Sequence, residues 1–582
     1  MSELNAQPER KPLSLNPKAL ATRIVKKFTT KEGIIGSYSY AALFTPDIPF
    51  LQKKDVYQPF FPLHGEMPLL LGAILGLQHS LAMLAGVITP PLIISNVANF
   101  DTEITQYLVS TSLIVSGLLS FVQMIRIKVP YTKYYIGTGL ISVVGTSFAT
   151  ITIITGAIPQ MYKNGTCPTA ADGTKLPCPD GYGGILGSAA ICSLLEIAMS
   201  FVPAKILQSM FPKLVTGPVV LLIGASLIED GFKNWGGGSN CYGNAGTDGY
   251  YSVCPNLGAP KAAVWGSSKY IGLGFSVFAT IVICERFGAP IMKSCAVICG
   301  LLVGCIIAAA CGYFSPDGIK VAPAASFIWV HTFKLTLYGP AILPMLAVYM
   351  VCAMEAIGDI TATCDVSRLP VEGEEYESRI QGGLLADGFN GCIASLMTIT
   401  PVSTFAQNNG VISITKCANK KVGYWNCFFL VVMGIFSKFA AALVSIPNPV
   451  LGGMTSFLFT SVAVSGLAII ASLNPITRRD RFILTCSLLF GFGATLVPDW
   501  FSYFFTYEGD NHGLKGFLDA IVLVLETGFA VAGFLGLLMN LIIPGEKGDG
   551  DTITGESTEL EVSSTENYPI KNEVEPNSKE FE

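Results

Sequence analysis

The sequence predicts an all-α protein that crosses a membrane many times, and three observations support this fold class. The chain has 582 residues, of which 51% are hydrophobic and only 13% are charged, whereas soluble domains carry roughly 25% charged residues. The mean hydropathy is +0.53. Apolar stretches of about 20 residues, the length needed to cross roughly 30 Å of hydrocarbon, recur along the chain.

The two ends of the chain differ from its apolar middle. Residues 1–66 are polar and of mixed charge. The first long apolar run begins near Pro68, too far along the chain for a cleaved signal peptide. Residues 544–582 are acidic, rich in Ser and Thr and poor in aromatic residues. We expect a cytoplasmic tail over 1–66 and a disordered, acidic cytoplasmic tail over 544–582.

Hydropathy predicts fourteen membrane spans, of which the third and the tenth are irregular. Their approximate cores are 68–90, 106–125, 137–159, 185–203, 213–232, 269–286, 290–312, 338–360, 380–400, 406–418, 423–446, 449–472, 481–499 and 517–543. With the N-terminus in the cytoplasm, the loops after even-numbered spans carry clusters of Lys and Arg, as the positive-inside rule requires. Both termini are then cytoplasmic. The acidic loop at 372–377 departs from this trend.

Two predicted outside loops carry features of an extracellular face. Asn164 begins an Asn-Gly-Thr sequon and is our candidate for glycosylation. The same loop holds Cys167 and Cys178, and the next outside loop holds Cys241 and Cys254. Disulfides are stable on this side of a membrane, so we predict one in each loop; the alternative is four free thiols. No cysteine or histidine pair has metal-ligand spacing, and we expect no metal and no cofactor.

The spans divide into two sets of seven, which predicts an inverted repeat because an odd number per half reverses the orientation. The third span of each half is interrupted, by Gly, Ser and Thr residues at 137–148 and by a β-prone stretch at 400–405. We expect a short strand in each, paired antiparallel, because a half-extended span must satisfy its backbone groups locally. The helices that follow would direct their positive dipole ends at one point. The alternative is that these small residues only permit close helix packing.

An amide-rich stretch follows the interruption of the tenth span. Gln407, Asn408 and Asn409 precede a glycine, and Lys416 ends the stretch. Each amide both donates and accepts hydrogen bonds in one plane, which suits the edge of a heterocyclic base. Such groups are costly in lipid unless they face a cavity or a partner. The stretch therefore predicts a polar ligand site inside the membrane.

Few ionisable residues lie deep in the apolar runs. Glu355 and Asp359 are spaced i and i+4 and share one helix face. Asp387 lies in the ninth span and His79 in the first. A carboxylate can accept from two ring N–H groups, so we predict that Glu355 and Gln407 clamp a base. A buried acid or histidine that changes protonation couples transport to protons.

We expect Asp359, Asp387 and His79 to form this proton relay, with Asn408 as a structural partner. Four other acidic residues are interpreted as lying at span ends, where helix capping or snorkelling explains them. These residues are Glu196, Glu229, Asp230 and Glu285.

Taken together, these motifs resemble the nucleobase–ascorbate transporter family (nucleobase:cation symporter 2), and within it the fungal uric acid–xanthine permeases. The stretch from Gln407 to Lys416 is similar to the family signature, and Glu355 to Asp359 to its acidic motif. The Gln78-His79 pair, and the Ala-Asp-Gly stretch around Asp387, are also similar. The resemblance covers roughly residues 38–545.

The resemblance implies a core domain, a gate domain and a homodimer. The core comprises 67–203 (segments 1–4) and 337–447 (segments 8–11), and the gate comprises 204–336 (segments 5–7) and 448–543 (segments 12–14).

The resemblance also implies roles for single residues. The backbone at Phe148 and the pair Phe405–Ala406 would contact the base, and Thr527 and Phe529 would filter substrates from the gate side. Position 416 is Lys where such permeases more often have Arg, a change that could alter specificity because Lys lacks the planar fork.

We therefore expect a proton-coupled purine permease that imports xanthine and uric acid across the plasma membrane by alternating access. Its partners would be the purine, protons, the lipid bilayer and a second copy of itself, with no nucleic acid. One alternative is an anion transporter of the same architecture, and another is a purine sensor that does not transport. We expect no enzyme, because the sequence shows no nucleophile–base pair or metal cluster, and no phosphate-binding loop for ATP.

Overall fold

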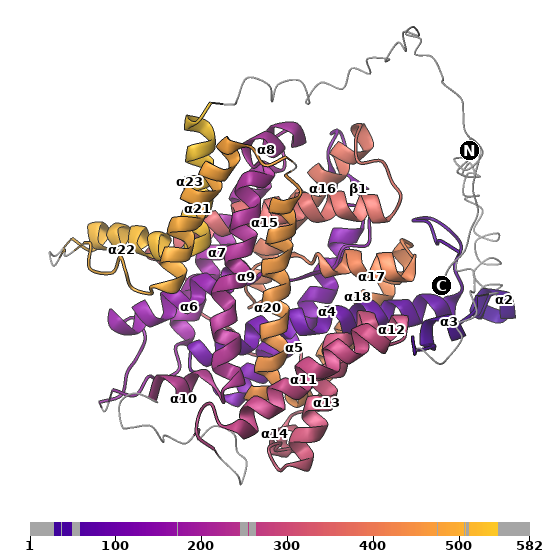
Figure 1. The fold of residues 1–582 in the computed structure, drawn as a ribbon, viewed down its shortest axis with the longest axis horizontal. Coiled ribbons are helices and arrows are strands. Elements are labelled where there is room, and N and C mark those ends of the chain that lie inside the picture. Colours follow the sequence, from indigo (N-terminus) through magenta and orange to yellow (C-terminus); the bar gives the residue numbers. More distant parts are fainter. Residues whose placement is uncertain are drawn as a thin grey trace, which may run out of the picture.

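The computed structural model describes residues 28–36, 38–48, 59–171, 173–244, 254, 263–473, 475–505, 507 and 511–544. The described part is almost entirely helical (Figure 1). The acidic tail and most of the N-terminal tail that the sequence predicts lie outside the described residues.

Seven helices of the described part are long and apolar enough to cross a membrane. They are α4 (Leu69–Val97), α5 (Thr102–Met124), α7 (Pro179–Met199), α9 (Lys213–Trp235), α11 (Ser268–Phe287), α15 (Gly339–Val366) and α20 (Asn448–Ala471). Two bent helix pairs raise the number to nine if each pair is one span. A multi-pass membrane protein is thereby confirmed, whereas the number fourteen stays a prediction.

The other predicted spans fall on shorter or more polar helices. These are α6 (Phe148–Lys163), α12 (Pro290–Ser294) with α13 (Ala296–Ala310), α16 (Glu374–Leu396), α17 (Gln407–Thr415) and α21 (Arg478–Leu496). The nine-residue α17 is only about 13 Å long and cannot cross a bilayer by itself. The described part also has five further short helices. α2 (Lys31–Ile34) and α3 (Ala41–Phe44) precede α4, and α8 (Ala204–Met210), α10 (Ser239–Asn244) and α14 (Asp317–Val321) lie between longer helices.

Two segments predicted as continuous spans are bent in the structure. α18 (Lys420–Ile435) meets α19 (Ser437–Val444) at 78°, and α22 (His512–Glu526) meets α23 (Gly528–Ile542) at 85°. Figure 1 shows α22 lying across the end of α23. The second bend falls at Thr527, whose backbone is extended while its hydroxyl donates to the Leu523 carbonyl oxygen at 2.6 Å. That hydroxyl satisfies a carbonyl oxygen at the end of α22. Hydropathy does not detect such a bend, because the residues on both sides of it are apolar.

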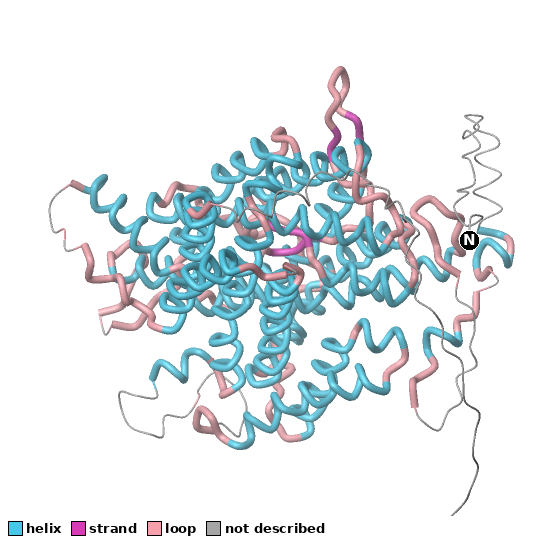
Figure 2. The backbone as a smooth tube through the Cα atoms, turned by 45° about the horizontal axis from the view of Figure 1, so that its top comes forward, coloured by secondary structure: helices cyan, strands magenta, loops and turns pink. Residues whose placement is uncertain are grey.

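A two-stranded antiparallel sheet lies among the helices (Figure 2). β3 (Val144–Thr146) pairs with β4 (Val402–Thr404) so that Val144 faces Thr404 and Thr146 faces Val402. All six residues are buried. A second sheet, formed by β1 (Ile127–Lys128) and β2 (Tyr135–Ile136), lies in the loop that follows α5.

The outer edge of β3 is satisfied by hydroxyl groups of α5. The Val144 N–H donates to Ser120 Oγ at 2.9 Å, and Ser116 donates to the Val144 carbonyl oxygen. The pairing continues past both strand ends, from the Phe405 N–H to the Val143 carbonyl at 3.0 Å and from the Ser147 N–H to the Pro401 carbonyl at 2.8 Å. An extended segment can therefore exist deep in the protein because its backbone groups have partners.

The disulfide and sequon candidates lie between α6 and α7 and between α9 and α11. Cys167 is bonded to Cys178, and Cys241 to Cys254. Asn164 ends α6 and its side chain is exposed.

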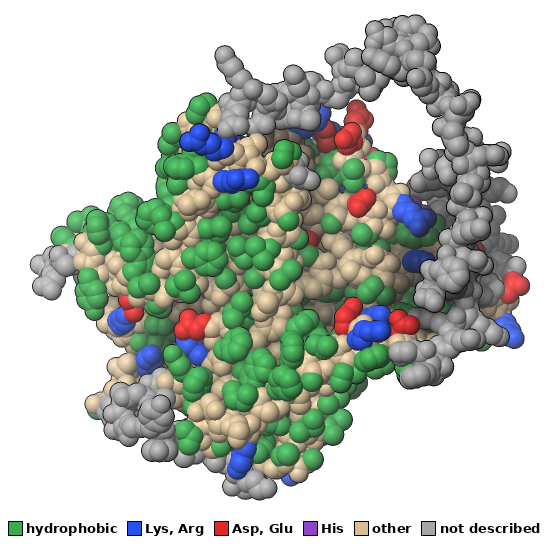
Figure 3. All heavy atoms as spheres, viewed as in Figure 1, with side chains coloured by type: hydrophobic (Ala, Val, Ile, Leu, Met, Phe, Trp, Pro, Cys, Tyr) green, Lys and Arg blue, Asp and Glu red, His purple; other side chains and the backbone are tan. Residues whose placement is uncertain are grey.

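Large apolar side chains are exposed on the sides of the helices, as a lipid environment requires (Figure 3). Examples are Phe275 and Ile283 of α11, Ile306 of α13 and Leu467 of α20.

Close helix packing depends on glycine. α9 and α20 approach so closely that a β-carbon at Gly224 would collide with the Ala463 backbone, and one at Gly466 with the Leu221 backbone. Small residues play this part in membrane proteins because helices there gain stability from close van der Waals contact.

We predict that Gly466→Val prevents assembly of the α9–α20 pair. Overpacking costs about 1–3 kcal/mol even where a core can shift, and here the added atoms meet backbone. Surface biotinylation should show a severalfold loss of protein at the membrane. The matched control is Gly272→Val on α11, where nothing lies within 4 Å of an added β-carbon. Equal amounts of both variants would contradict the packing argument.

Candidate functional site

The strand pair brings the starts of two helices together. α6 begins at Phe148 and α17 at Gln407, directly after β3 and β4. Because the strands are antiparallel and only three residues long, α6 and α17 start at opposite ends of a sheet about 7 Å in length. Phe148, the first residue of α6, stacks on Phe405, which lies two residues before α17. The first N–H groups of a helix have no partner in the helix and carry the positive end of its dipole. Together these two ends favour oxygen atoms of a ligand.

Three aromatic rings meet at this point. Phe148 and Phe405 lie parallel, with ring centroids 5.9 Å apart and planes 4° from each other. The edge of Phe459, from α20, meets Phe148 at 5.7 Å and 88°. Phe405 fits because Gly86 and Gly145 lie against its ring, where a β-carbon would come within 3 Å. The rings present an apolar surface on which a planar ligand can stack.

Glu355 and Asp359 of α15 lie against β4. The Glu355 carboxyl group faces the Ser403 hydroxyl, and that of Asp359 faces Thr404. Both acidic side chains are half-buried, whereas the two hydroxyl residues are buried. The i and i+4 spacing therefore places both carboxyl groups along the strand from which α17 starts.

The three amides of the predicted motif face different partners. Gln407 is half-buried in the first turn of α17. Asn408 is buried, and its Nδ2 donates to the Ile141 carbonyl oxygen at 2.6 Å. Asn409 Oδ1 accepts from Thr363 Oγ1 of α15 at 2.6 Å. Asn408 and Asn409 thus hold α17 in place, and the sequence reasoning had given Asn409 no role. Gln407 directly follows Phe405 and Ala406 in the chain.

The two side chains of the Gln78-His79 pair on α4 face different helices. His79 is fully buried and faces Asn408, and neither ring nitrogen has a hydrogen-bond partner among the described residues. Gln78 Nε2 instead donates to Ser294 Oγ at 2.7 Å, at the end of α12. His79 is therefore beside the amide motif, whereas Gln78 connects α4 to α12.

Glu196 corrects one interpretation from the sequence. The assignment to a span end, explained by capping or snorkelling, is wrong because Glu196 is fully buried on α7 and faces Asp387 of α16, itself fully buried. Gly388 permits this approach, since a β-carbon there would come within 2.9 Å of the Ile197 backbone nitrogen. The signal was present in the sequence: position 196 lies well inside the predicted span 185–203.

The three residues predicted as a specificity gate lie in two places. Thr527 and Phe529 are buried at the α22–α23 bend, and Phe529 belongs to the same apolar cluster as Phe148 and Phe459. Lys416 is exposed at the opposite end of α17, about 13 Å along the helix from Gln407. Its backbone is left-handed, with φ at 52°, and its carbonyl oxygen accepts from the Phe61 N–H at 3.0 Å.

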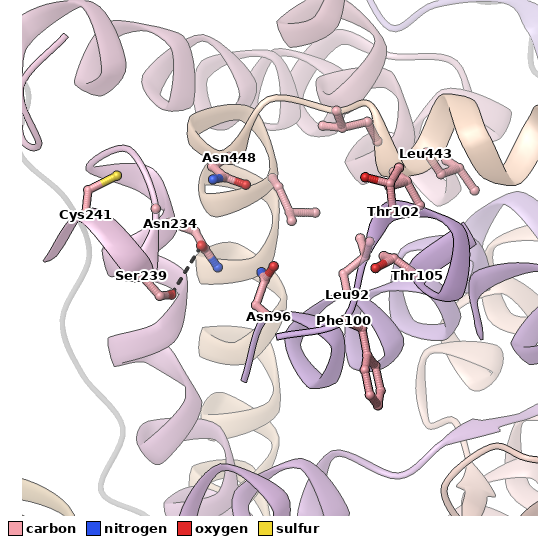
Figure 4. Close-up of a pocket in the computed structure, with 14 residues that line it drawn as sticks. Leu92, Asn96, Phe100, Thr102, Thr105, Asn234, Ser239, Cys241, Leu443 and Asn448 are labelled. Carbon is pink, nitrogen blue, oxygen red and sulfur yellow. Dashed lines mark hydrogen bonds between the residues drawn. The ribbon is translucent and has the colours of Figure 1, made fainter. Parts of the chain in front are cut away.

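A separate polar pocket of about 220 Å³ lies between the α4–α5 turn and the junction of α9, α10 and α20 (Figure 4). Asn96, Asn234 and Asn448 line it, and Ser239 donates to Asn234 Oδ1 at 3.4 Å. Cys241, one of the disulfide cysteines, also lines it. The sequence reasoning missed this pocket because its residues come from three distant segments, 92–105, 234–241 and 443–451. Its amides and hydroxyls suit a polar, uncharged ligand.

The chain is similar to known permeases over most of its length. Residues 72–500 match the model of a family described as "Permease family". A purine permease of Emericella nidulans is 63% identical over 525 residues, which cover 90% of each chain. The uric acid–xanthine permease of the same fungus is 57% identical over 523 residues, again 90% of each chain. Xanthine permease XanQ of Escherichia coli is 29% identical and covers 83% of this chain and 94% of its own.

A solved structure shows the fold alone. The murine Slc26a9 anion transporter in its inward-facing state matches with a TM-score of 0.51 at 11% identity, over 92% of this chain and 73% of that chain.

Among the described residues, no group of three His, Cys, Asp or Glu side chains could hold a metal ion.

The match over 72–500 and the fungal relatives confirm the family resemblance. The chain is a membrane transport protein rather than an enzyme, and it belongs to the permease family.

Proposed function

We propose that this permease carries a purine base, with xanthine and uric acid as substrates, together with protons across the plasma membrane. The observation that carries the proposal is the position of Glu355, whose carboxyl group faces β4 in the strand pair from which α6 and α17 start. The relatives named purine permease and uric acid–xanthine permease support this substrate class.

The chemistry of the site matches the edges of an oxidised purine. Glu355 accepts hydrogen bonds from two ring N–H groups, and the Gln407 amide donates to and accepts from the neighbouring edge. Carbonyl oxygens of the base turn toward the first N–H groups of α6 and α17, at Phe148 and after Phe405–Ala406. Asn408 supports the site from behind through its bond to Ile141.

Proton coupling rests on acidic and basic groups near this clamp. Asp359 faces β4, Asp387 is buried on α16, and His79 is buried beside Asn408. These groups have few fixed partners, so a proton gained or lost changes the charge next to the substrate.

Alternating access moves a core domain (67–203 and 337–447) against a gate domain (204–336 and 448–543). The inverted repeat is supported by the matching strand and short helix in each half, β3 with α6 and β4 with α17. The contact of Phe148 with Phe459 crosses the proposed boundary, and Phe529 joins the same cluster from the gate side. Thr527 sets the bend before Phe529. Lys416, exposed at the far end of α17, acts on specificity only through the position of that helix.

The pocket in Figure 4 fits this scheme as an outer entrance. It lies between core elements α4, α5 and α19 and gate elements α9, α10 and α20, beside the Cys241–Cys254 disulfide.

We place both termini in the cytoplasm. The two disulfide loops and a glycan on Asn164 are placed outside, and we propose a homodimer. An anion transporter is disfavoured because two carboxyl groups line the strand pair, and no observation favours a sensor.

We predict that Glu355→Gln lowers xanthine uptake by about 100-fold, because losing two charge-assisted hydrogen bonds costs roughly 3 kcal/mol. Radiolabelled xanthine uptake would be measured in cells without their own purine permeases, normalised to protein at the surface. Glu285→Gln, an exposed position on α11, is the matched control and keeps the parental rate. Parental uptake by the Glu355 variant would remove Glu355 from the clamp.

We predict that Asp359→Asn abolishes the rise of xanthine uptake in acid, because the neutral amide cannot bind the transported proton. Initial rates are compared at acidic and neutral pH for parent and variant. A variant that keeps the parental ratio of the two rates would exclude Asp359 from proton coupling.

A further inference from the structure

We propose that Glu196 and Asp387 share one proton between their carboxyl groups, and that Glu196 is a further proton-coupling residue of this permease. The inference rests on the proposed function of proton-coupled purine uptake. It adds Glu196 to the proton-coupling residues predicted from the sequence and gives it a role separate from the substrate clamp.

The geometry isolates the two acids from water and from other partners. Glu196 on α7 and Asp387 on α16 are each 0% exposed, and their carboxyl groups face each other. None of their four carboxyl oxygens has a hydrogen-bond partner among the described residues. Gly388, the residue after Asp387, lets α16 lie directly against the α7 backbone at Glu196 and Ile197.

The surroundings supply no compensating positive charge within the described part of the chain. The titratable groups that face the pair are Glu355, Asp359, Cys352 and Tyr349 of α15. Arg379 lies two turns before Asp387 on α16, but it is engaged with Glu375 at 2.7 Å and the Thr138 carbonyl at 2.9 Å. Neutralisation must therefore come from a bound species.

A proton is the species that fits. Two ionised carboxylates in contact repel strongly away from water. One added proton forms an O–H bond on one acid, which then donates to the other carboxylate, so that the pair carries a single charge and each acid gains a partner. A metal ion would need more ligands, and no group of three suitable side chains occurs among the described residues.

The pair is linked to the substrate clamp by charge. Asp387 interacts electrostatically with Asp359 of α15, and Glu196 does so with Glu355. A proton on the Glu196–Asp387 pair removes one negative charge from this group of acids. That favours the ionised form of Glu355, which is the form that accepts two N–H groups of a base. Proton binding at the pair and purine binding at the clamp therefore favour each other, as symport requires.

The test is xanthine accumulation by Glu196→Gln in cells without their own purine permeases, with Glu285→Gln as the exposed control. A gradient of one pH unit drives about tenfold accumulation for one proton. We expect the Glu196 variant to lose the tenfold accumulation and the acid stimulation of uptake. Exchange of internal for external xanthine, which needs no net proton movement, should fall less. The control should accumulate xanthine like the parent.

The outcomes separate this inference from the proposed function. If the parent itself shows no acid-stimulated xanthine uptake, the proposed function fails. If the parent accumulates xanthine and Glu196→Gln keeps its full pH profile, or loses uptake and exchange in equal measure, the shared-proton site is overturned. Should Glu196→Gln not reach the membrane, Glu196→Asp decides: it retains a carboxyl group and is expected to accumulate xanthine with a displaced pH profile, and an unchanged profile contradicts the inference.

Discussion

The rest of the structure depends on the pairing of two extended segments in the middle of a helical membrane protein. Backbone groups there find no water, so β3 and β4 must satisfy each other and borrow hydroxyls from α5 at Ser116 and Ser120. Because the segments are extended, α6 and α17 begin inside the protein and expose their first N–H groups there. Both glycines beside Phe405 and the carboxyl groups facing β4 serve a site that exists only because of this pairing.

The acids near this site fall into two environments that differ in what they face. Glu355 and Asp359 face hydroxyl groups of β4, a kind of group that can donate to an ionised carboxylate. Glu196 and Asp387 face each other and have no hydrogen-bond donor among the described residues. The first environment favours negative charge that a ligand can use, and the second favours a proton. The division follows from helix packing, because α15 lies against the strand whereas α7 meets α16 at a glycine.

Features of the structure that have a local cause could be predicted from the sequence. Glycine, proline and β-prone residues marked the two strands, the i and i+4 spacing set the common face of Glu355 and Asp359, and cysteines of one loop paired with each other. Features with a tertiary cause were missed. Hydropathy tolerates a bend at Thr527 because the flanking residues stay apolar. It also tolerates one acid in a long apolar span, so Glu196 was interpreted as a span-end residue although it is fully buried.

The amide motif shows why its residues differ in what they control. Asn408 fixes α17 to the Ile141 backbone and Asn409 fixes it to Thr363 of α15, so the start of α17 is held from two sides. Gln407 occupies that start, and its position is set by these two bonds rather than by its own side chain. Changes at Thr363 or around Ile141 are therefore expected to move Gln407, the amide that we propose reads the ligand edge, without touching the ligand. Specificity within such a site can vary while Glu355, Gln407 and the strand pair stay unchanged.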